Sequence, residues 1–151
     1  MKLSTKGRYG LRAMVDLAFY SINEPVSIQS IAQRQNLSDS YLEQLFGKLR
    51  KAGLIASVRG AQGGYILAKK ADNISVGDIL RALEGDLTPV ECSEITGERS
   101  CDSSESCVTK YVWKKINDSI SNTVDAILLS ELVNNMSDCN TDPNSNRDCD
   151  K

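Results

Sequence analysis

The strongest constraint on the fold is the order of patterns in residues 27–68, where two short amphipathic helix patterns are followed directly by two apolar runs. A serine precedes each helix pattern, at Ser27 and Ser38, and a serine side chain is a good helix N-cap. The two apolar runs are separated by six residues, three of them glycine, which predicts a β-hairpin. Two short helices joined by a tight turn and followed by a hairpin form a winged helix-turn-helix, and we expect this fold.

Further helix patterns surround this segment. One amphipathic helix is expected over 5–22, ending before Pro25, and another over 76–84 after the capping residue Ser75. The expected fold class is therefore mostly α, a winged helix-turn-helix with a small β-hairpin wing and a long C-terminal dimerisation helix. The expected parts are the winged domain at 1–85, a cysteine-bearing loop at 86–108, the dimerisation helix at 109–135 and a disordered tail at 136–151.

The helix expected over 109–135 would carry one apolar stripe along roughly 40 Å, at a rise of ~1.5 Å per residue. The stripe consists of Val112, Ile116, Ile120, Val124, Ile127, Leu128 and Leu132. A small winged-helix domain cannot cover so long a stripe, and twofold dimers are the commonest oligomers. We therefore expect a homodimer in which two copies of the stripe pack together. The alternative is a helix that folds back on its own domain.

Charge is divided unevenly along the chain. Residues 1–83 carry a balance of +6 and residues 84–151 a balance of −8, which together give the net charge of −2. A basic half in an acidic chain is typical of a module that binds a polyanion. Charged side chains also do no more than solvate a surface in many proteins, so the helix-turn-helix pattern is what favours double-stranded DNA as the partner.

Composition excludes several classes of function. No apolar run approaches the ~18 residues of a membrane span, and the basic start leads into an amphipathic stretch rather than a secretory segment. We therefore expect a cytoplasmic protein without membrane contact. Histidine is absent, which excludes catalysis and metal ligation by histidine. An enzyme is not expected, because no pair of nucleophile and base and no phosphate-binding loop is evident.

In a helix-turn-helix, the N-terminal residues of the second helix reach base edges in the major groove. The candidates for base contacts here are Ser38, Asp39, Ser40, Glu43 and Gln44. Lys48, Arg50 and Lys51 follow as candidates for contacts to the DNA backbone. At the tip of the hairpin, Arg59 stands on a flexible glycine framework and suits insertion into a narrow minor groove. Taken singly, these residues would be read as a helix cap and solvated side chains; their order favours DNA recognition.

Cysteines are concentrated in the acidic loop, where Cys92, Cys101 and Cys107 have the spacing Cys-x8-Cys-x5-Cys. Disulfides are disfavoured in the cytosol, and the neighbours of these cysteines are polar rather than apolar. Three thiolates on one loop favour zinc or an iron–sulfur cluster, and the spacing fits no common zinc pattern. A thiol switch and an incidental cluster of cysteines are the alternatives. Cys139 and Cys149 in the tail are expected to be exposed free thiols.

Three parts of the chain resemble the iron–sulfur cluster regulator (IscR) family: the opening KLSTKGRYGLRAMVDLA, the stretch SDSYLEQLFGKLRKAGLIASVRGAQGGYILA and the loop with three cysteines. This family comprises dimeric winged-helix transcription repressors and has cysteine-metabolism (CymR) and nitric-oxide-sensing (NsrR) relatives. The resemblance implies that the three loop cysteines are cluster ligands. It also implies that Ser40, Glu43, Gln44 and Arg59 contact DNA, with Glu43 discouraging one class of site in the cluster-free form.

The chain departs from this family in three places, one of which is a first gap between cysteines that is longer than in many members. Lys110 stands where some members have a histidine ligand, and Arg8 stands where some nitric-oxide sensors have an acidic residue. The fourth ligand is therefore open, and so is the cluster type, of which 2Fe–2S is favoured over 4Fe–4S.

The expected function is a homodimeric repressor of genes for iron–sulfur cluster assembly or sulfur metabolism that senses its cluster. One alternative is a cluster-free repressor of cysteine metabolism that acts through a partner protein or thiol oxidation, and an enzyme of iron–sulfur assembly or sulfur metabolism is a candidate partner. Another is a cluster carrier or adaptor that binds proteins.

Overall fold

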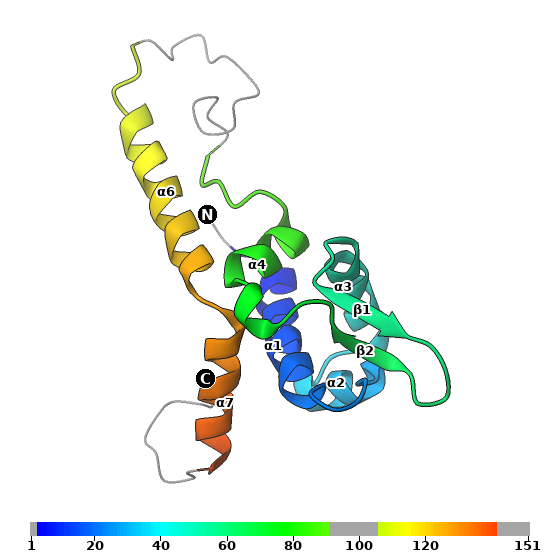
Figure 1. Cartoon of the computed structure of the whole chain (residues 1–151). Coiled ribbons are helices and arrows are strands. Elements are labelled where there is room, and N and C mark those ends of the chain that lie inside the picture. The colour runs from blue at the N-terminus through cyan, green and yellow to red at the C-terminus, as the bar shows by residue number, and fades with distance from the viewer. Residues whose placement is uncertain (1–2, 91–105, 142–151) are drawn as a thin grey trace.

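A computed structural model describes residues 3–90 and 106–141 of the chain (Figure 1). Its elements are α1 (Thr5–Tyr20), α2 (Ile28–Gln35), α3 (Asp39–Lys51), β1 (Ile55–Val58), β2 (Gly64–Leu67), the 3-10 helix η1 (Ala71–Asn73), α4 (Val76–Glu84), α6 (Lys110–Ala126) and α7 (Leu129–Thr141). This order is that of a winged helix-turn-helix, so the expected mostly α, winged helix-turn-helix fold with a β-hairpin wing is confirmed. No helix within these ranges is long and apolar enough to cross a membrane.

The helix starts follow from local chemistry. The side chains of Ser27, Ser38 and Ser75 accept hydrogen bonds from backbone N–H groups in the first turns of α2, α3 and α4, as the sequence predicts. Between α2 and α3, Asn36 adopts a left-handed conformation with φ of 54°. Asparagine tolerates this conformation better than most residues do, and it allows the tight turn of the helix-turn-helix.

The core lies where α1, α2, α3 and α4 meet. Its largest fully buried side chains include Met14 and Leu17 from α1, Phe46 from α3 and Ile79 from α4. Leu129, at the start of α7, is also fully buried in this core. The C-terminal part of the chain therefore returns to close the interior of the winged domain.

The wing is a two-stranded antiparallel hairpin in which Ile55 pairs with Leu67 and Val58 with Gly64. Its second strand also forms a bridge with the segment before α2, where the backbone N–H of Val26 donates to Tyr65 at 3.0 Å and that of Tyr65 donates back at 2.8 Å. A side chain at Gly64 would collide with the carbonyl group of Val26. Glycine at this position is therefore required by close backbone packing at the base of the wing.

The prediction of a single helix over 109–135 is wrong, because the chain leaves the helical path at Ile127 and Leu128. There Val76 donates its N–H to the carbonyl of Ile127 and Leu129 donates to that of Ile74, both at 2.9 Å. These bonds replace those of a continuous helix and direct Leu129 into the core. The second helix, α7, runs to Thr141, so the start of the expected disordered tail is helical.

Helix α6 projects from the winged domain, as Figure 1 shows. It has no buried residue, and its attachment to α4 includes the ion pair between Arg81 and Asp125, whose closest atoms are 2.6 Å apart. The predicted apolar stripe is present on this helix but uncovered: Val112 and Ile116 are both exposed. The other part of the stripe behaves differently, because Val124, Ile127 and Leu132 pack around Val76 and Leu80 of α4.

Candidate nucleic-acid interface

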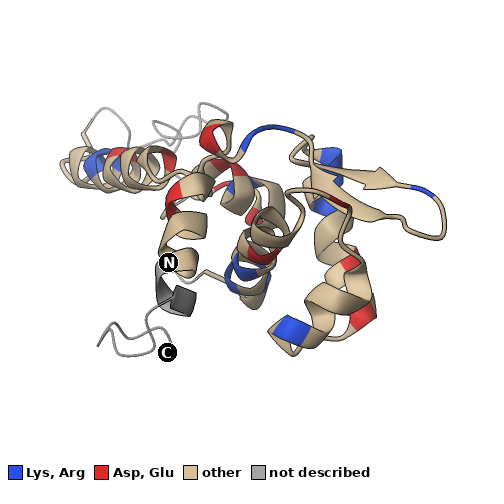
Figure 2. Ribbon diagram, turned by 60° about the horizontal axis from the view of Figure 1, so that its bottom comes forward, with Lys and Arg blue, Asp and Glu red and all other residues tan. Residues whose placement is uncertain are grey.

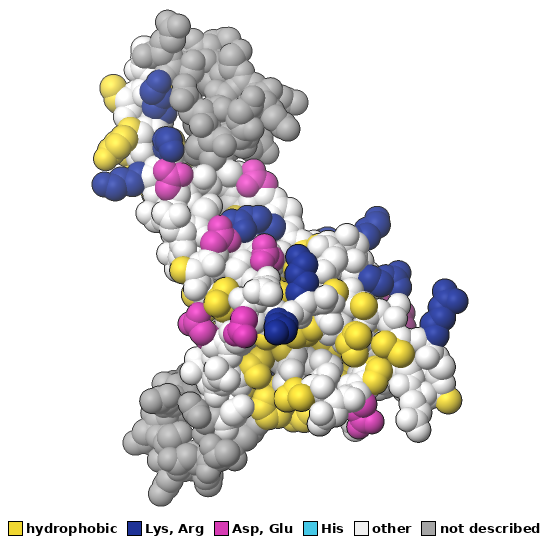
Figure 3. Space-filling view, in the orientation of Figure 1, with side chains coloured by type: hydrophobic (Ala, Val, Ile, Leu, Met, Phe, Trp, Pro, Cys, Tyr) yellow, Lys and Arg dark blue, Asp and Glu magenta, His cyan; other side chains and the backbone are white. Residues whose placement is uncertain are grey.

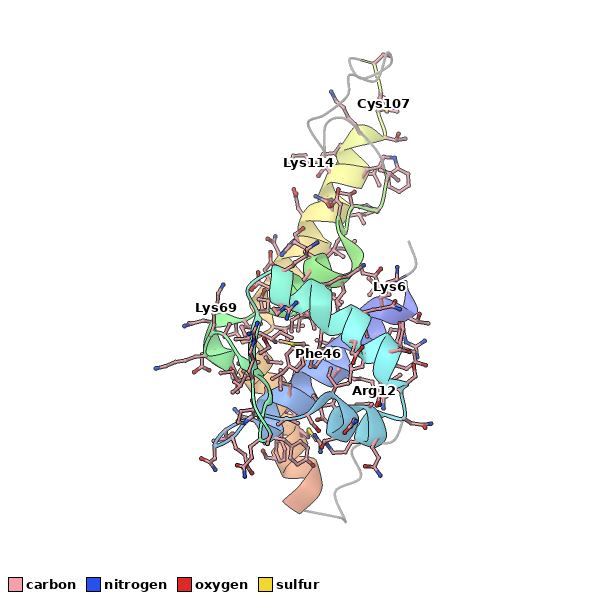
Figure 4. The ribbon with its side chains drawn as sticks, turned by 90° about the vertical axis from the view of Figure 1, so that its right-hand side faces the viewer. Lys6, Arg12, Phe46, Lys69, Cys107 and Lys114 are labelled. Atoms are coloured by element: carbon pink, nitrogen blue, oxygen red, sulfur yellow. The ribbon has the colours of Figure 1, made fainter. Side chains whose placement is uncertain are left out.

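Helix α3 has one face in the core and one face in solvent. Leu42, Leu45, Phe46 and Leu49 form the buried face. The predicted base-contacting residues Ser38, Asp39, Ser40, Glu43 and Gln44 are all exposed. Figure 4 shows α3 crossing the side of the molecule turned to the viewer, with Phe46 behind it. The predicted residues therefore share one accessible, polar surface, which is the arrangement that insertion into a groove requires.

The N-terminal end of α3 is held against the start of α1. The ring of Tyr41 packs edge-on against Tyr9, with centroids 6.3 Å apart, and the Tyr41 hydroxyl donates to Thr5 Oγ1 at 3.4 Å. This contact brings two exposed basic residues of α1, Lys6 and Arg8, to the same end of α3; Lys6 is labelled in Figure 4. Lys6 and Arg8 are not among the residues predicted from the sequence to contact DNA, although their charges are visible in the motif KGR.

The start of α1 is fixed in turn by α4. The Glu84 carboxylate accepts hydrogen bonds from the backbone N–H and hydroxyl of Ser4 and from the N–H of Gly7, at 2.7–3.0 Å. Burial acts to raise the pKa of Glu84, but these hydrogen bonds outweigh it and lower the pKa overall. The ionised carboxylate lies at the N-terminus of α1, where negative charge is favoured.

The C-terminal end of α3 carries the predicted backbone contacts. Arg50 and Lys51 are exposed. Lys48 differs, because its ammonium group donates a hydrogen bond to the carbonyl of Leu83 at 3.0 Å. The Leu83 carbonyl lies at the end of α4, so Lys48 ties α3 to α4. An ammonium group has further donors, and a phosphate contact by Lys48 would use one of these.

The wing places Arg59 in the exposed loop between β1 and β2. Figure 2 marks Lys and Arg positions in blue on the ribbon of α3 and the hairpin, and Figure 3 shows Lys and Arg side chains on this part of the surface. The glycines of this loop are expected to form a flexible framework. The structure gives Gly63 a packing reason: a side chain there would collide with the carbonyl of Val58, and its N–H donates to Gly60 at 3.0 Å.

A buried ion pair, missed by the sequence analysis, joins α1 to α2. The side chain of Asp16 is 1% exposed, and it accepts hydrogen bonds from Arg34 at 2.7 Å and from Gln35 at 2.9 Å. The guanidinium of Arg34 also lies 4.0 Å from the centre of the Tyr20 ring. These contacts fix the first helix of the helix-turn-helix on α1. A carboxylate on the apolar side of an amphipathic helix was the available signal.

Of the predicted cysteine ligands, Cys92 and Cys101 lie outside the described residues. Cys107 lies just before α6, with its sulfur 3.3 Å from the hydroxyl oxygen of Thr109. Hydrogen bonds from the Thr109 hydroxyl and from the backbone N–H groups of Thr109 and Lys110 lower the pKa of the Cys107 thiol. A thiolate is the form of cysteine that binds metal, so this environment fits a ligand. Among residues 3–90 and 106–141, no three His, Cys, Asp or Glu side chains form a metal site.

Comparison with known proteins agrees with this geometry. The Rrf2 family, described as "Iron-dependent Transcriptional regulator", matches residues 3–135. The HTH-type transcriptional regulator IscR of Erwinia tasmaniensis is 45% identical over 89% of this chain and 80% of its own.

Two solved structures are also similar. T. potens IscR has a TM-score of 0.74 and 47% identity, with 92% of this chain and 90% of its own covered. CymR, the global cysteine regulator of B. subtilis, has a TM-score of 0.74 and 42% identity, with 89% and 97% covered. These relatives are regulators and not enzymes. The chain belongs to the Rrf2 family and is a DNA-binding transcriptional regulator of the IscR type.

Proposed function

We propose that this chain is a homodimeric, sequence-specific transcription repressor whose affinity for its operator depends on an iron–sulfur cluster held by Cys92, Cys101 and Cys107. The observation that carries the proposal is the exposed polar face of α3 beside an arginine-bearing wing. This combination can contact a major groove and an adjacent minor groove at the same time.

Each exposed residue has a role that its chemistry suits. Ser38, Ser40 and Gln44 would contact base edges or nearby phosphates, and glutamine suits adenine in particular. Glu43 would accept a hydrogen bond from the cytosine amino group and repel phosphates elsewhere, so it acts on sequence selection more than on affinity. The backbone contacts would come from Lys48, Arg50 and Lys51, and Arg59 would enter the minor groove. Lys6 and Arg8 would add phosphate contacts beside the start of α3.

The dimer is proposed from the surface of α6. Tyr111, Val112 and Ile116 are 65%, 47% and 38% exposed on a helix with no buried residue. A second copy of the same helix would cover these side chains by twofold symmetry. Two winged domains held in this way would contact two half-sites on one face of a duplex.

The three cysteine thiolates would hold the cluster, of 2Fe–2S type rather than 4Fe–4S, and the identity of a fourth ligand is open. When bound, the cluster would link these three cysteines to one another. Whether this link is present would depend on the supply of iron and sulfide and on the oxidation state of the cluster. The protein side of the coupling is contiguous. Cys107 lies just before α6, Asp125 of α6 pairs with Arg81 of α4, and the Leu83 carbonyl of α4 accepts from Lys48 of α3. A displacement of α6 would therefore reach α3 through two polar contacts.

The regulated genes would be those of iron–sulfur cluster assembly or sulfur metabolism, since the similar proteins are named IscR and a global cysteine regulator. A second candidate function follows from the similarity to CymR: a cluster-free repressor of cysteine metabolism that responds to a partner enzyme or to thiol oxidation. A DNA-binding repressor of either kind would act in the cytoplasm.

The test combines cofactor analysis with DNA binding. Protein purified without oxygen should contain iron and sulfide and absorb visible light, and each of Cys92→Ser, Cys101→Ser and Cys107→Ser should lose this absorption. Duplexes selected from a random pool by the wild type should bind with an affinity that falls steeply as salt rises. A triple variant should bind them 5–150-fold differently, a range of about 1–3 kcal/mol.

Each contrary result identifies a different alternative. Colourless wild-type protein with the same operator affinity as the triple variant would favour the CymR-like function. A protein that holds a cluster but enriches no duplex would instead favour a carrier or adaptor. The matched control is Cys149→Ser, which should leave both absorption and affinity unchanged.

A further inference from the structure

Gly47 in the middle of α3 is the one glycine in residues 3–90 for which the structure gives no internal reason. A side chain added there would meet no atom within 4 Å. The glycines of α1 and α4 differ, because an added side chain at Gly7, Gly10 or Gly77 would collide with Glu84, Leu83 or Asp125 respectively. The remaining glycines in this range lie outside helices, and each has either a positive φ or a close backbone neighbour.

An unexplained glycine at this position has a cost. Glycine is among the poorest helix formers, because it loses the most backbone freedom on folding. Gly47 stands in the third turn of a 13-residue helix, where alanine would be more stable and would fit the space. Nothing in the described part of the molecule compensates for this cost. The reason for a glycine at this position therefore lies in another molecule that approaches α3 from outside.

The direction of that approach follows from helix geometry. Residues three or four positions apart lie on the same side of an α-helix. Gly47 therefore continues the line formed by Ser40 and Gln44, and Lys51 follows it. This line lies opposite the buried face formed by Leu42, Leu45, Phe46 and Leu49. Gly47 is thus on the side of α3 that would face DNA.

We propose that Gly47 is a positioning residue that sets how deeply α3 enters the major groove. The inference rests on the proposed DNA-binding role of α3. A major groove about 12 Å wide admits a helix about 10–12 Å across with little clearance. A side chain on the inserted face would hold the helix axis away from the groove floor. Without such a side chain, the helix enters deeply enough for Ser40 and Gln44 to reach the base edges. Phosphate contacts at the rim of the groove do not require this depth.

The experiment compares Gly47→Ala and Gly47→Leu with the wild type as full-length protein. Both variants should raise Tm by about 2–4 °C, because both residues are better helix formers than glycine. Binding to a duplex selected by the wild type from a random pool should fall with side-chain size, about 3-fold for alanine and at least ~30-fold for leucine. Binding to a scrambled duplex of the same length should change less than 3-fold, since phosphate contacts carry most of it.

The control is Asn122→Leu, which adds the same side chain to an exposed position of α6 and should leave both affinities unchanged. Selected-duplex affinities of Gly47→Leu equal to the wild type would overturn the inference. A fall in Tm would also overturn it, because it would reveal an internal role for the glycine, and so would a loss of dimer mass. Failure of the wild type itself to enrich any duplex would contradict the proposed function instead.

Discussion

The winged domain and helix α6 bury their apolar residues to very different extents. In the winged domain, side chains from four helices and from α7 form a continuous core. Helix α6 is also amphipathic but has no buried residue, and its apolar side chains Tyr111, Val112 and Ile116 are exposed. The winged domain is thus complete within one chain, whereas the apolar surface of α6 is left uncovered, and the proposed dimer would cover it. Four substitutions test this contrast.

Phe46→Ala should have the largest effect. The ring is fully buried in the core, with its centroid 5.1 Å from that of Tyr65 in the wing. Its removal should lower the free energy of unfolding by about 3–5 kcal/mol, from lost burial and a cavity. Urea unfolding followed by circular dichroism measures this change. Asn122→Ala in α6 is the control and should stay within about 0.5 kcal/mol of the wild type.

Asp16→Ala should have the next largest effect, about 2 kcal/mol, because it leaves Arg34 and Gln35 without their buried acceptor. The value is below that of a fully buried pair, since the Arg34 side chain is 33% exposed. The matched control is Asp118→Ala, which breaks an exposed pair with Lys114 and should cost less than about 0.5 kcal/mol. Equal losses in the two variants would contradict the role given to the α1–α2 ion pair.

Ile116→Asp in α6 should act on assembly instead of folding. A charge placed in the proposed dimer surface should raise the dimer dissociation constant at least ~10-fold, or about 1.4 kcal/mol, measured by sedimentation equilibrium. The circular dichroism spectrum should be unchanged, because Ile116 has no place in the core. Asn122→Asp adds the same charge to α6 and should leave the constant as it is. A wild type that is monomeric at all concentrations would contradict the proposed dimer surface on α6.

Glu84→Gln should have the smallest effect, and one that depends on pH. Because the folded pKa of Glu84 is lowered, its ionised form stabilises the fold above the unfolded pKa of about 4.3. That stability is lost as pH falls through the folded pKa. The difference in unfolding free energy between wild type and variant should therefore be largest near neutral pH and should disappear in acid. A gap independent of pH between 7 and 3 would show that charge is not involved; exposed Glu24→Gln is the control.

Local signals made much of the winged domain predictable. Each of Ser27, Ser38 and Ser75 acts within its own helix turn, so sequence alone places the caps. The exposed face of α3 was predictable for a similar reason, since the period of its apolar residues determines which side chains point outward.

Contacts between distant segments could not be predicted in this way. The apolar period of α6 continues past Ile127, but the backbone bonds to Ile74 and Val76 end the helix there, together with a bond from the Leu128 N–H to the Glu131 carboxylate. Lys48 has the sequence context of any surface lysine, and its bond to the Leu83 carbonyl depends on how α4 packs. The Asp16–Arg34 pair also depends on how two helices meet. The glycines of the wing predicted a flexible loop, whereas the structure shows that Gly63 and Gly64 are required by close backbone neighbours.

The entry of Leu129 into the core has a consequence for how the molecule melts. A polypeptide cut after residue 85 would leave an empty space in the interior of its DNA-binding part. The winged domain and α7 should therefore unfold as one cooperative unit, with a single calorimetric transition. Because α6 and α7 are separated only by Ile127 and Leu128, a force on α6 is transmitted covalently to the centre of that unit.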